Sequence, residues 1–228
     1  NKYCSVGLIY YICSMIDNIN IIKTLLNFEK EGDFYMLYVF KRKKDQPEGE
    51  RDNHQSVRTI KTYCVNSVEY LEKRYDEVKQ LCEIFNARAY IHVQKQNHSD
   101  VSLDMMVSLA ERIKNGVHNQ KGLFDSVVGQ IKTNEKRWVI DIDNVSIDSF
   151  NHNPYYISMR DYINELQVEA KKEQGMTFVR TKSGIHIITQ PFNVMKFKER
   201  YPDVDIQKKN PTVLYLSLIH ISEPTRLQ

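Results

Sequence analysis

The chain has 228 residues, of which 41% are hydrophobic and 27% charged, and its formal net charge is +3. This composition is typical of a folded domain with a hydrophobic core and excludes a low-complexity or disordered chain. The weak positive charge permits binding of nucleic acids or nucleotides without requiring it.

Both ends of the sequence are expected to lie outside the natural domain. Residues 216–228 resemble the translation of a transposase-adaptor sequence used in DNA library preparation, so the natural sequence is expected to stop near Tyr215. Residues 1–14 precede the first methionine, Met15, and are interpreted as upstream sequence read in frame or as an N-terminal strand. Because such segments do not inform the fold, we expect one domain over residues 15–215, truncated at its C-terminal end.

The sequence carries no signal for secretion or membrane insertion. The apolar stretch at residues 6–16 is too short to span a bilayer and lacks the flanks of a signal peptide. The four cysteines form no CxxC pair, which argues against a disulfide framework or a zinc site. We therefore expect a cytoplasmic protein without a membrane partner.

Strands and helices alternate in the first half of the chain. Segments rich in aromatic and β-branched residues predict strands over residues 34–40, 57–65 and 88–93. Apolar residues three and four positions apart predict helices over residues 68–85 and 99–115. Asn66 with Glu69 fits a capping box for the first helix, and Ser99 or Asp100 can cap the second. The second helix is expected to bury Met106, Leu109, Ala110 and Ile113.

The second half continues the alternation after an irregular stretch at residues 117–136. Strands are predicted over residues 137–143, 176–181, 185–190 and from 203 onward. Helices are predicted over residues 158–172, ending at Gly175, and from a cap at Asn193 to Arg200. This order predicts an α/β or α+β domain with a mixed β-sheet flanked by helices.

Three short segments carry residues suited to chemistry. Asp141 and Asp143 share one face of a predicted strand, which suits a divalent cation, although a solvated strand end is about equally expected. The run from Arg180 through Lys182, Ser183 and Gly184 to His186 offers a tight turn with a hydroxyl, an imidazole and basic groups for a phosphate.

The third segment repeats the acidic pattern near the end of the chain. Asp203 and Asp205 share a face beside Lys208 and Lys209. A solvated charge cluster is the alternative interpretation of this segment, as a plain β-hairpin is of the previous one. The basic run at residues 41–44 can likewise touch a nucleic-acid backbone or form a solvated loop.

In combination, these segments are more specific than each alone. An Asp-x-Asp strand, a helix, a hairpin with Ser183 and His186, a short helix and a final Val204–Asp205 occur in that order. This order resembles the catalytic core of the archaeo-eukaryotic primase superfamily, including phage and plasmid primase-polymerases, over residues 137–215. The Ser183-to-His186 spacing is one residue longer than the family's tightest Ser-x-His motif.

The resemblance implies an RRM-like core and metal-dependent nucleotidyl transfer in the DNA replication of a phage or mobile element. It implies that Asp141, Asp143 and Asp205 hold Mg²⁺ or Mn²⁺, and that Ser183 and His186 contact the incoming nucleoside triphosphate. From their proximity in sequence, Arg180, Lys182 and Lys208 are expected to neutralise its charge. A nucleic-acid template and replication proteins are the implied partners.

Two alternatives remain open at the level of sequence. The first is a non-catalytic module that uses the same sheet to bind nucleic acid or a replication partner. The second is a metal-dependent nuclease, which uses the same carboxylates but needs no triphosphate.

Overall fold

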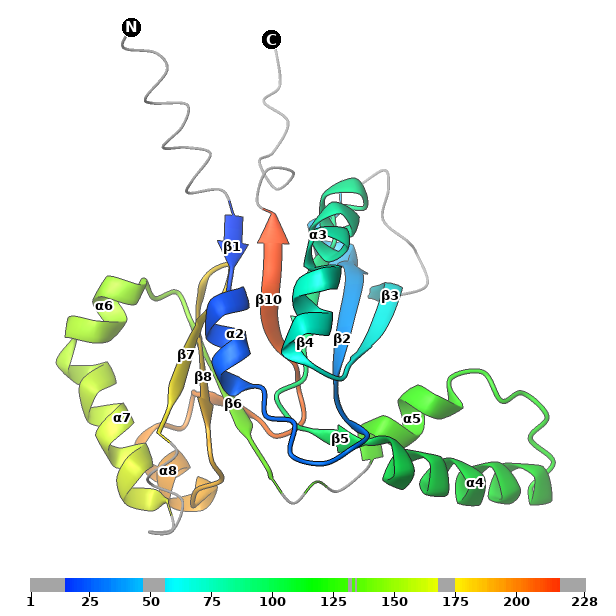
Figure 1. Cartoon of the computed structure of the whole chain (residues 1–228). Coiled ribbons are helices and arrows are strands. Elements are labelled where there is room, and N and C mark those ends of the chain that lie inside the picture. Colours follow the sequence, from blue (N-terminus) through cyan, green and yellow to red (C-terminus); the bar gives the residue numbers. More distant parts are fainter. Residues whose placement is uncertain (1–14, 47–55, 131–132, 134, 168–174, 218–228) are drawn as a thin grey trace, which may run out of the picture.

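The computed structural model describes residues 15–46, 56–130, 133, 135–167 and 175–217. These residues form two β-sheets, one of six strands and one of four, with helices packed around them (Figure 1). The predictions for residues 1–14, for residues 218–228 and for a helix continuing beyond residue 167 lie outside the described part of the chain.

The larger sheet combines the two ends of the described chain with its first half. Its strand order is β1-β10-β4-β2-β3, with β5 paired to β2. The strands are β1 (Met15–Asp17), β2 (Asp33–Arg42), β3 (Val57–Val65), β4 (Arg88–Ile91), β5 (Gln96–Asn97) and β10 (Thr212–Ser217). A short 3₁₀ turn, Lys43–Asp45, follows β2.

The α+β class is confirmed, but the expected mixed sheet is replaced by two antiparallel ones. Every strand pairing within the described residues is antiparallel. Helix α3 (Val68–Ile84) does connect two strands that run in the same direction, β3 and β4. These strands lie on opposite sides of β2 and pair with it rather than with each other. The alternation of strands and helices therefore did not produce a parallel ladder.

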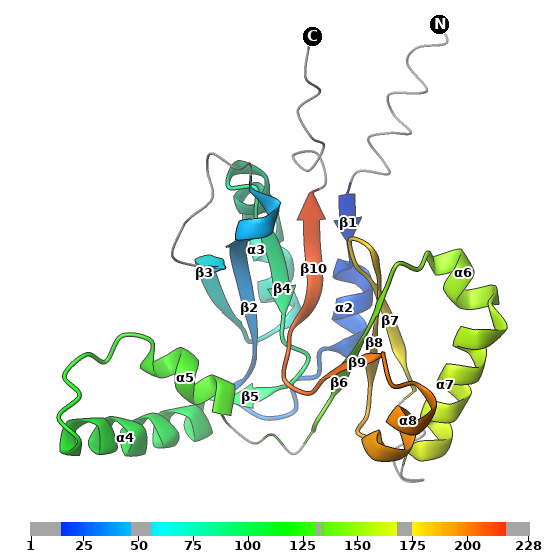
Figure 2. The same ribbon diagram turned by 180° about the vertical axis from the view of Figure 1, so that it is seen from behind.

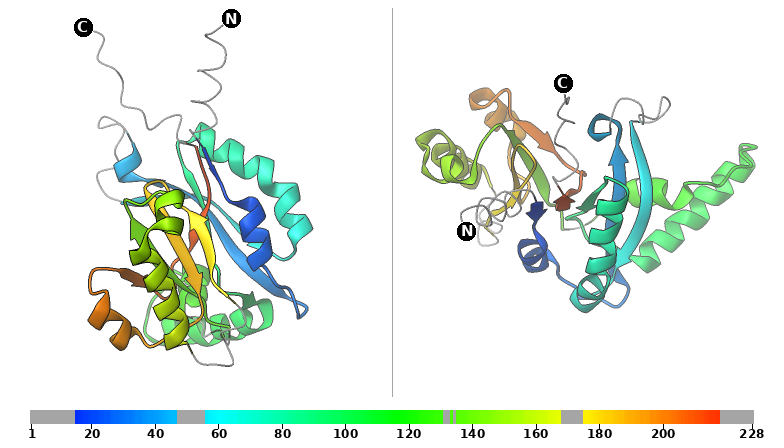
Figure 3. Two further views of the ribbon diagram at one scale, coloured as in Figure 1. Left: turned by 90° about the vertical axis from the view of Figure 1, so that its left-hand side faces the viewer. Right: turned by 90° about the horizontal axis from the view of Figure 1, so that it is seen from above.

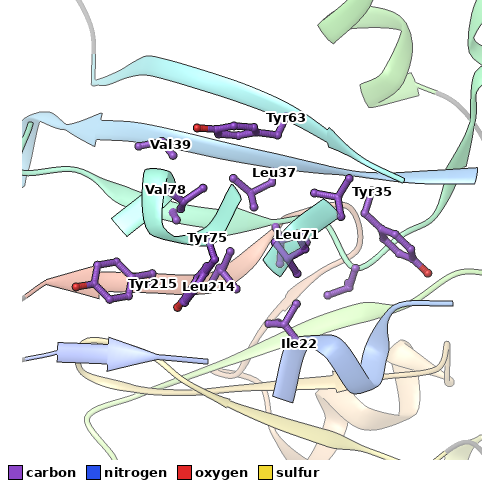
Figure 4. Packing of buried hydrophobic residues seen from close by; sticks show 14 of the residues in the cluster. Ile22, Tyr35, Leu37, Val39, Tyr63, Leu71, Tyr75, Val78, Leu214 and Tyr215 are labelled. Atoms are coloured by element: carbon purple, nitrogen blue, oxygen red, sulfur yellow. The ribbon is translucent and has the colours of Figure 1, made fainter. Parts of the chain in front are cut away.

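One face of the larger sheet is covered by α3 and by α2 (Ile19–Leu25). Figure 4 shows Leu71 and Val78 of α3 next to Leu37 and Val39 of β2. The same core also contains Val139, which belongs to the smaller sheet. Side chains of both sheets therefore contribute to this hydrophobic core.

The opposite face of the larger sheet is covered by α4 (His98–Lys114) and α5 (Leu123–Gln130). Helix α5 lies within the stretch that the sequence left irregular. The prediction for α4 was right for Leu109, which packs against the core, and wrong for Met106 and Ile113, which are 68% and 62% exposed. Val101 and Met105, which lie eight and four residues before Leu109, pack on the sheet together with it.

The smaller sheet has the order β7-β8-β6-β9. Its strands are β6 (Trp138–Asp143), β7 (Thr177–Arg180), β8 (Gly184–Thr189) and β9 (Asp205–Gln207). Its outer face packs against α6 (Ile147–His152), α7 (Pro154–Leu166) and α8 (Val194–Arg200) (Figure 2). Ile140 and Ile142 point into that core, as predicted, so Asp141 and Asp143 face the larger sheet.

The capping residues of two helices and the end of the C-terminal strand differ from those expected. Ser67 caps α3 by accepting a hydrogen bond from the Tyr70 amide, and Asn97 caps α4 in the same way through the Ser99 amide. Asn193 caps α8 as predicted. Strand β10 runs two residues beyond Tyr215, and buried Leu216 lies opposite Ile16 of β1.

No helix in the described ranges has the length and apolar character that crossing a membrane requires.

Candidate functional site

The central strand of the smaller sheet brings three predicted site residues into one row. Asp141 of β6 lies opposite His186 of β8 on one side and opposite Asp205 of β9 on the other. Directly opposed residues on antiparallel strands have Cβ atoms about 5 Å apart. The row Asp205–Asp141–His186 therefore crosses three neighbouring strands on the face turned toward the larger sheet.

Asp143 lies next along β6, opposite Gly184, and is joined to the hairpin turn. The Ser183 hydroxyl donates a hydrogen bond to Asp143 Oδ1 over 3.2 Å. The turn is closed internally, because the Gly184 amide donates to Thr181 Oγ1 and the Thr181 amide donates to the Gly184 carbonyl. Those two amides are thus engaged within the turn and are not available to a phosphate.

The environment of Asp141 disfavours its negative charge. Burial is the main cause, followed by repulsion from Asp143 and Asp205, and together they raise the pKa of Asp141 to about 6. Arg42 and Lys44 act in the opposite direction. A group of carboxylates that repel one another is an arrangement that a bound cation stabilises.

His186 is neutral at pH 7 for a related reason. Burial lowers its pKa to about 4, although Asp143 opposes this shift. Its Nδ1 lies 2.9 Å from Thr212 Oγ1, and its Nε2 lies 3.5 Å from Asp141 Oδ1. An imidazole that accepts the Thr212 proton at Nδ1 carries its own proton on Nε2, directed at Asp141. The contact is therefore between a neutral ring and a carboxylate rather than an ion pair.

We predict that His186 stays neutral in the folded protein down to about pH 4, as its lowered pKa requires. Between about pH 6.5 and 4 the unfolded chain binds a proton at this position and the folded chain does not, so His186 makes folding less stable as pH falls through this window. ¹⁵N chemical shifts of the imidazoles, assigned with a His186→Gln variant, measure this directly. Titration of His186 near pH 6.5 in the folded state would contradict the buried, neutral ring.

A cavity of about 590 Å³ lies between the two sheets, and Asp205, which is exposed, is not among the residues that line it. Asp141, Asp143, Ser183 and His186 contribute from the smaller sheet, while Phe40 and Tyr90 of the larger sheet stack with ring centroids 4.8 Å apart. Seen from above, the two sheets stand side by side (Figure 3). We call this space the inter-sheet cavity.

The larger sheet and the hairpin supply positive charge to the same cavity. Arg42 and Lys44, at the end of β2, and Lys182, in the hairpin turn, line it. We call these three residues the basic wall. Burial lowers the pKa of Lys182, with Asp45 opposing the shift. The cavity therefore combines carboxylates on one sheet with cationic side chains on its other sides.

A buried ion pair supports the basic wall. Arg88 of β4 donates to Asp45, and the two side chains are 5% and 4% exposed. Both residues line the inter-sheet cavity. Because a buried charge without its partner is costly, this pair fixes the end of the Lys43–Asp45 turn and with it the position of Lys44.

Two predicted basic residues lie elsewhere. Arg180 does not line the inter-sheet cavity but a second hollow, which shares Lys182 and Ser183 with it. Lys208 lies 5.0 Å from the centroid of the Trp138 ring, on the face of β6 opposite Asp141. Arg180 and Lys208 were predicted because they lie close in sequence to the Ser/His and acidic segments. Arg42 and Lys44 are distant in sequence from those segments. The basic run at residues 41–44 was the signal that pointed to them.

The carboxylates do not yet converge on one point. Asp205 accepts a hydrogen bond from Gln207 and Asp143 accepts one from Ser183. Among the described residues, no group of three or more His, Cys, Asp or Glu side chains is arranged to hold a metal ion. The donors are nevertheless the hard oxygens that Mg²⁺ and Mn²⁺ prefer.

Comparisons of this chain with protein-family models, with curated proteins and with solved structures find no match. The site is therefore interpreted from its own geometry.

Proposed function

We propose that the chain is a metal-dependent nucleotidyltransferase of primase-polymerase type, acting with nucleoside triphosphates on a nucleic-acid template. The observation that carries the proposal is the composition of the inter-sheet cavity. Repelling carboxylates on β6 stand across from the cationic side chains of the basic wall. In a complex of a divalent cation with a polyphosphate, the cation would bind the carboxylates and the phosphates would bind the basic wall.

The order of elements supports the same proposal. The acidic strand β6 is followed by helices α6 and α7, the hairpin β7-β8 with Ser183 and His186, helix α8 and then Asp205 on β9. In the antiparallel pairing of β6 with β8 and β9, Asp141 lies opposite both His186 and Asp205. The segments that resemble the primase superfamily in sequence are thus neighbours in space.

Each residue has a distinct role in the proposal. Asp141, Asp143 and Asp205 would hold Mg²⁺ or Mn²⁺, which supplies charge neutralisation at the reacting phosphate. The neutral His186 would donate a hydrogen bond from Nε2, and Ser183 would exchange its bond to Asp143 for one to a phosphate oxygen. Arg42, Lys44 and Lys182 would neutralise the remaining triphosphate charge, and the stacked Phe40 and Tyr90 rings offer an apolar surface to a base.

The experiment is a nucleotide-incorporation assay with the full chain. A labelled primer–template and an unprimed single strand are each incubated with nucleoside triphosphates and Mg²⁺ or Mn²⁺. Metal-dependent and template-dependent products longer than the primer, or new products on the unprimed strand, would support the proposal.

Two other outcomes would overturn it. Cleavage of the strand without triphosphates would identify a nuclease. Saturable binding of the template, with no product at any concentration of either metal, would identify a non-catalytic binding module.

A further inference from the structure

Helices α4 and α5 project from the larger sheet as an arm, on the side away from the smaller sheet (Figures 1 and 3). Their inner sides pack on Phe34 and Met36 of β2. Val101 is the one α4 residue that is fully buried. The outer side of α4 thus contributes little to the core of the domain.

That outer side carries an apolar stripe without a partner among the described residues. Leu103, Met106, Val107 and Ile113 are 62%, 68%, 58% and 62% exposed. Their spacing of three, one and six residues places them on one side of the helix. Single exposed apolar residues are common, but a continuous stripe of this kind marks an interaction site.

A groove runs beside the stripe, between α4 and α5. It encloses about 520 Å³, and its lining combines apolar Leu103, Val107 and Val127 with polar Asp100, Asp104, Ser108 and Gln130. We call it the α4–α5 groove. At about 100° per residue, Glu111 falls on the same side of α4 as these two aspartates.

The acidic rim, Asp100, Asp104 and Glu111, is not neutralised within the protein. No ion pair joins any of the three to a basic side chain in the described ranges. A groove with both apolar and unpaired acidic side chains, beside an exposed apolar stripe, is complementary to an amphipathic helix that carries basic residues beside its apolar face.

We propose that the α4–α5 groove binds a basic amphipathic helix of another protein. A second copy of this chain fits less well. In a two-fold antiparallel pair of α4 helices, each flank meets the same flank of its partner, so the acidic rim would face itself. The proposal does not depend on the proposed catalytic function, because the groove shares no lining residue with the inter-sheet cavity.

The test uses fluorescein-labelled peptides and fluorescence anisotropy. One helical peptide carries leucines at i, i+3, i+4 and i+7 with flanking arginines, and a matched peptide replaces every arginine with glutamate. The full chain is expected to bind the basic peptide at least about tenfold more tightly than the acidic one, with an affinity that falls as salt rises.

Variants locate the binding surface. Leu103→Lys is expected to weaken binding of the basic peptide at least about tenfold. The double variant Asp100→Asn with Asp104→Asn is expected to weaken binding of the basic peptide several-fold and to make its affinity less dependent on salt. Ile84→Lys, at a 73% exposed apolar position on α3, is the matched control and is expected to leave binding unchanged.

Three outcomes would overturn the proposal. The first is equal affinity for the two peptides, and the second is unchanged binding by Leu103→Lys. The third is a dimer in sedimentation that Val107→Lys dissociates, which would assign the groove to a second copy of the chain.

Discussion

Replacing Asp141 with asparagine is expected to lower metal-dependent nucleotide incorporation by at least about a thousandfold. A metal ion stabilises a phosphoryl-transfer transition state by several kcal/mol, and each ~1.4 kcal/mol is a factor of ten. Asp141 is central because it is the one carboxylate with Asp205 and His186 as direct cross-strand neighbours.

The same substitution should raise thermal stability when no metal is present. The pKa of Asp141 is raised to about 6 in the folded protein, above its ordinary value of 3.8, so its ionisation opposes folding as pH rises through that range. Asparagine removes this cost at pH 7. Loss of activity with an increased Tm separates a functional carboxylate from a structural one.

Asp203→Asn is the matched control, since Asp203 is exposed and lies just before β9. It should leave both incorporation and Tm unchanged. Retention of activity by Asp141→Asn, or equal losses in the two variants, would contradict the assignment.

Gly184→Ala is expected to destabilise the domain by at least about 3 kcal/mol. A Cβ at this position would lie 1.9 Å from the Ile142 carbonyl oxygen and 2.9 Å from its carbon, both backbone atoms of β6. A backbone in the middle of a sheet cannot move aside without breaking its pairing. Differential scanning calorimetry should show a Tm lower by roughly 6–12 °C, for a domain of this size.

Gly129→Ala on α5 is the control for that substitution, because an added Cβ meets no atom within 4 Å there. Alanine is favoured over glycine within a helix by about 0.5–1 kcal/mol, so this variant should be as stable as the wild type or more so. A folded Gly184→Ala protein with unchanged Tm would show that β6 and β8 lie farther apart at this point.

Local patterns predicted most strands and helices because their signals lie within each segment. The alternation of side chains between the two faces of β6 identified which residues face the core, and the cap at Asn193 marked the start of α8. The same patterns could not choose between two apolar stripes on α4. Burial there depends on the sheet beneath, which Val101, Met105 and Leu109 contact.

Elements with weak local signals were placed less well. Helix α5 lay in a stretch without a regular pattern, because only Leu123, Val127 and Val128 are buried in its short length. The sequence predicted Asn66 as the cap of α3, whereas Ser67, whose backbone is extended, is the residue that accepts a hydrogen bond from the Tyr70 amide.

The candidate site was predictable in its composition and not in its geometry. Sequence identified Asp141, Asp143, His186 and Asp205 separately. Their adjacency depends on strand register, which long-range pairing sets. The basic wall was even harder to predict from the sequence, because Arg42 and Asp141 line one cavity only as a result of the packing of the two sheets.

The central claim is that three carboxylates from β6 and β9 share a divalent cation. Diffraction from crystals grown with Mn²⁺ and a non-hydrolysable nucleoside triphosphate, recorded near the manganese absorption edge, locates the ion directly. We predict an anomalous peak within about 2.5 Å of oxygens from Asp141, Asp143 and Asp205. A peak elsewhere, or none at these side chains under saturating Mn²⁺, would contradict this account.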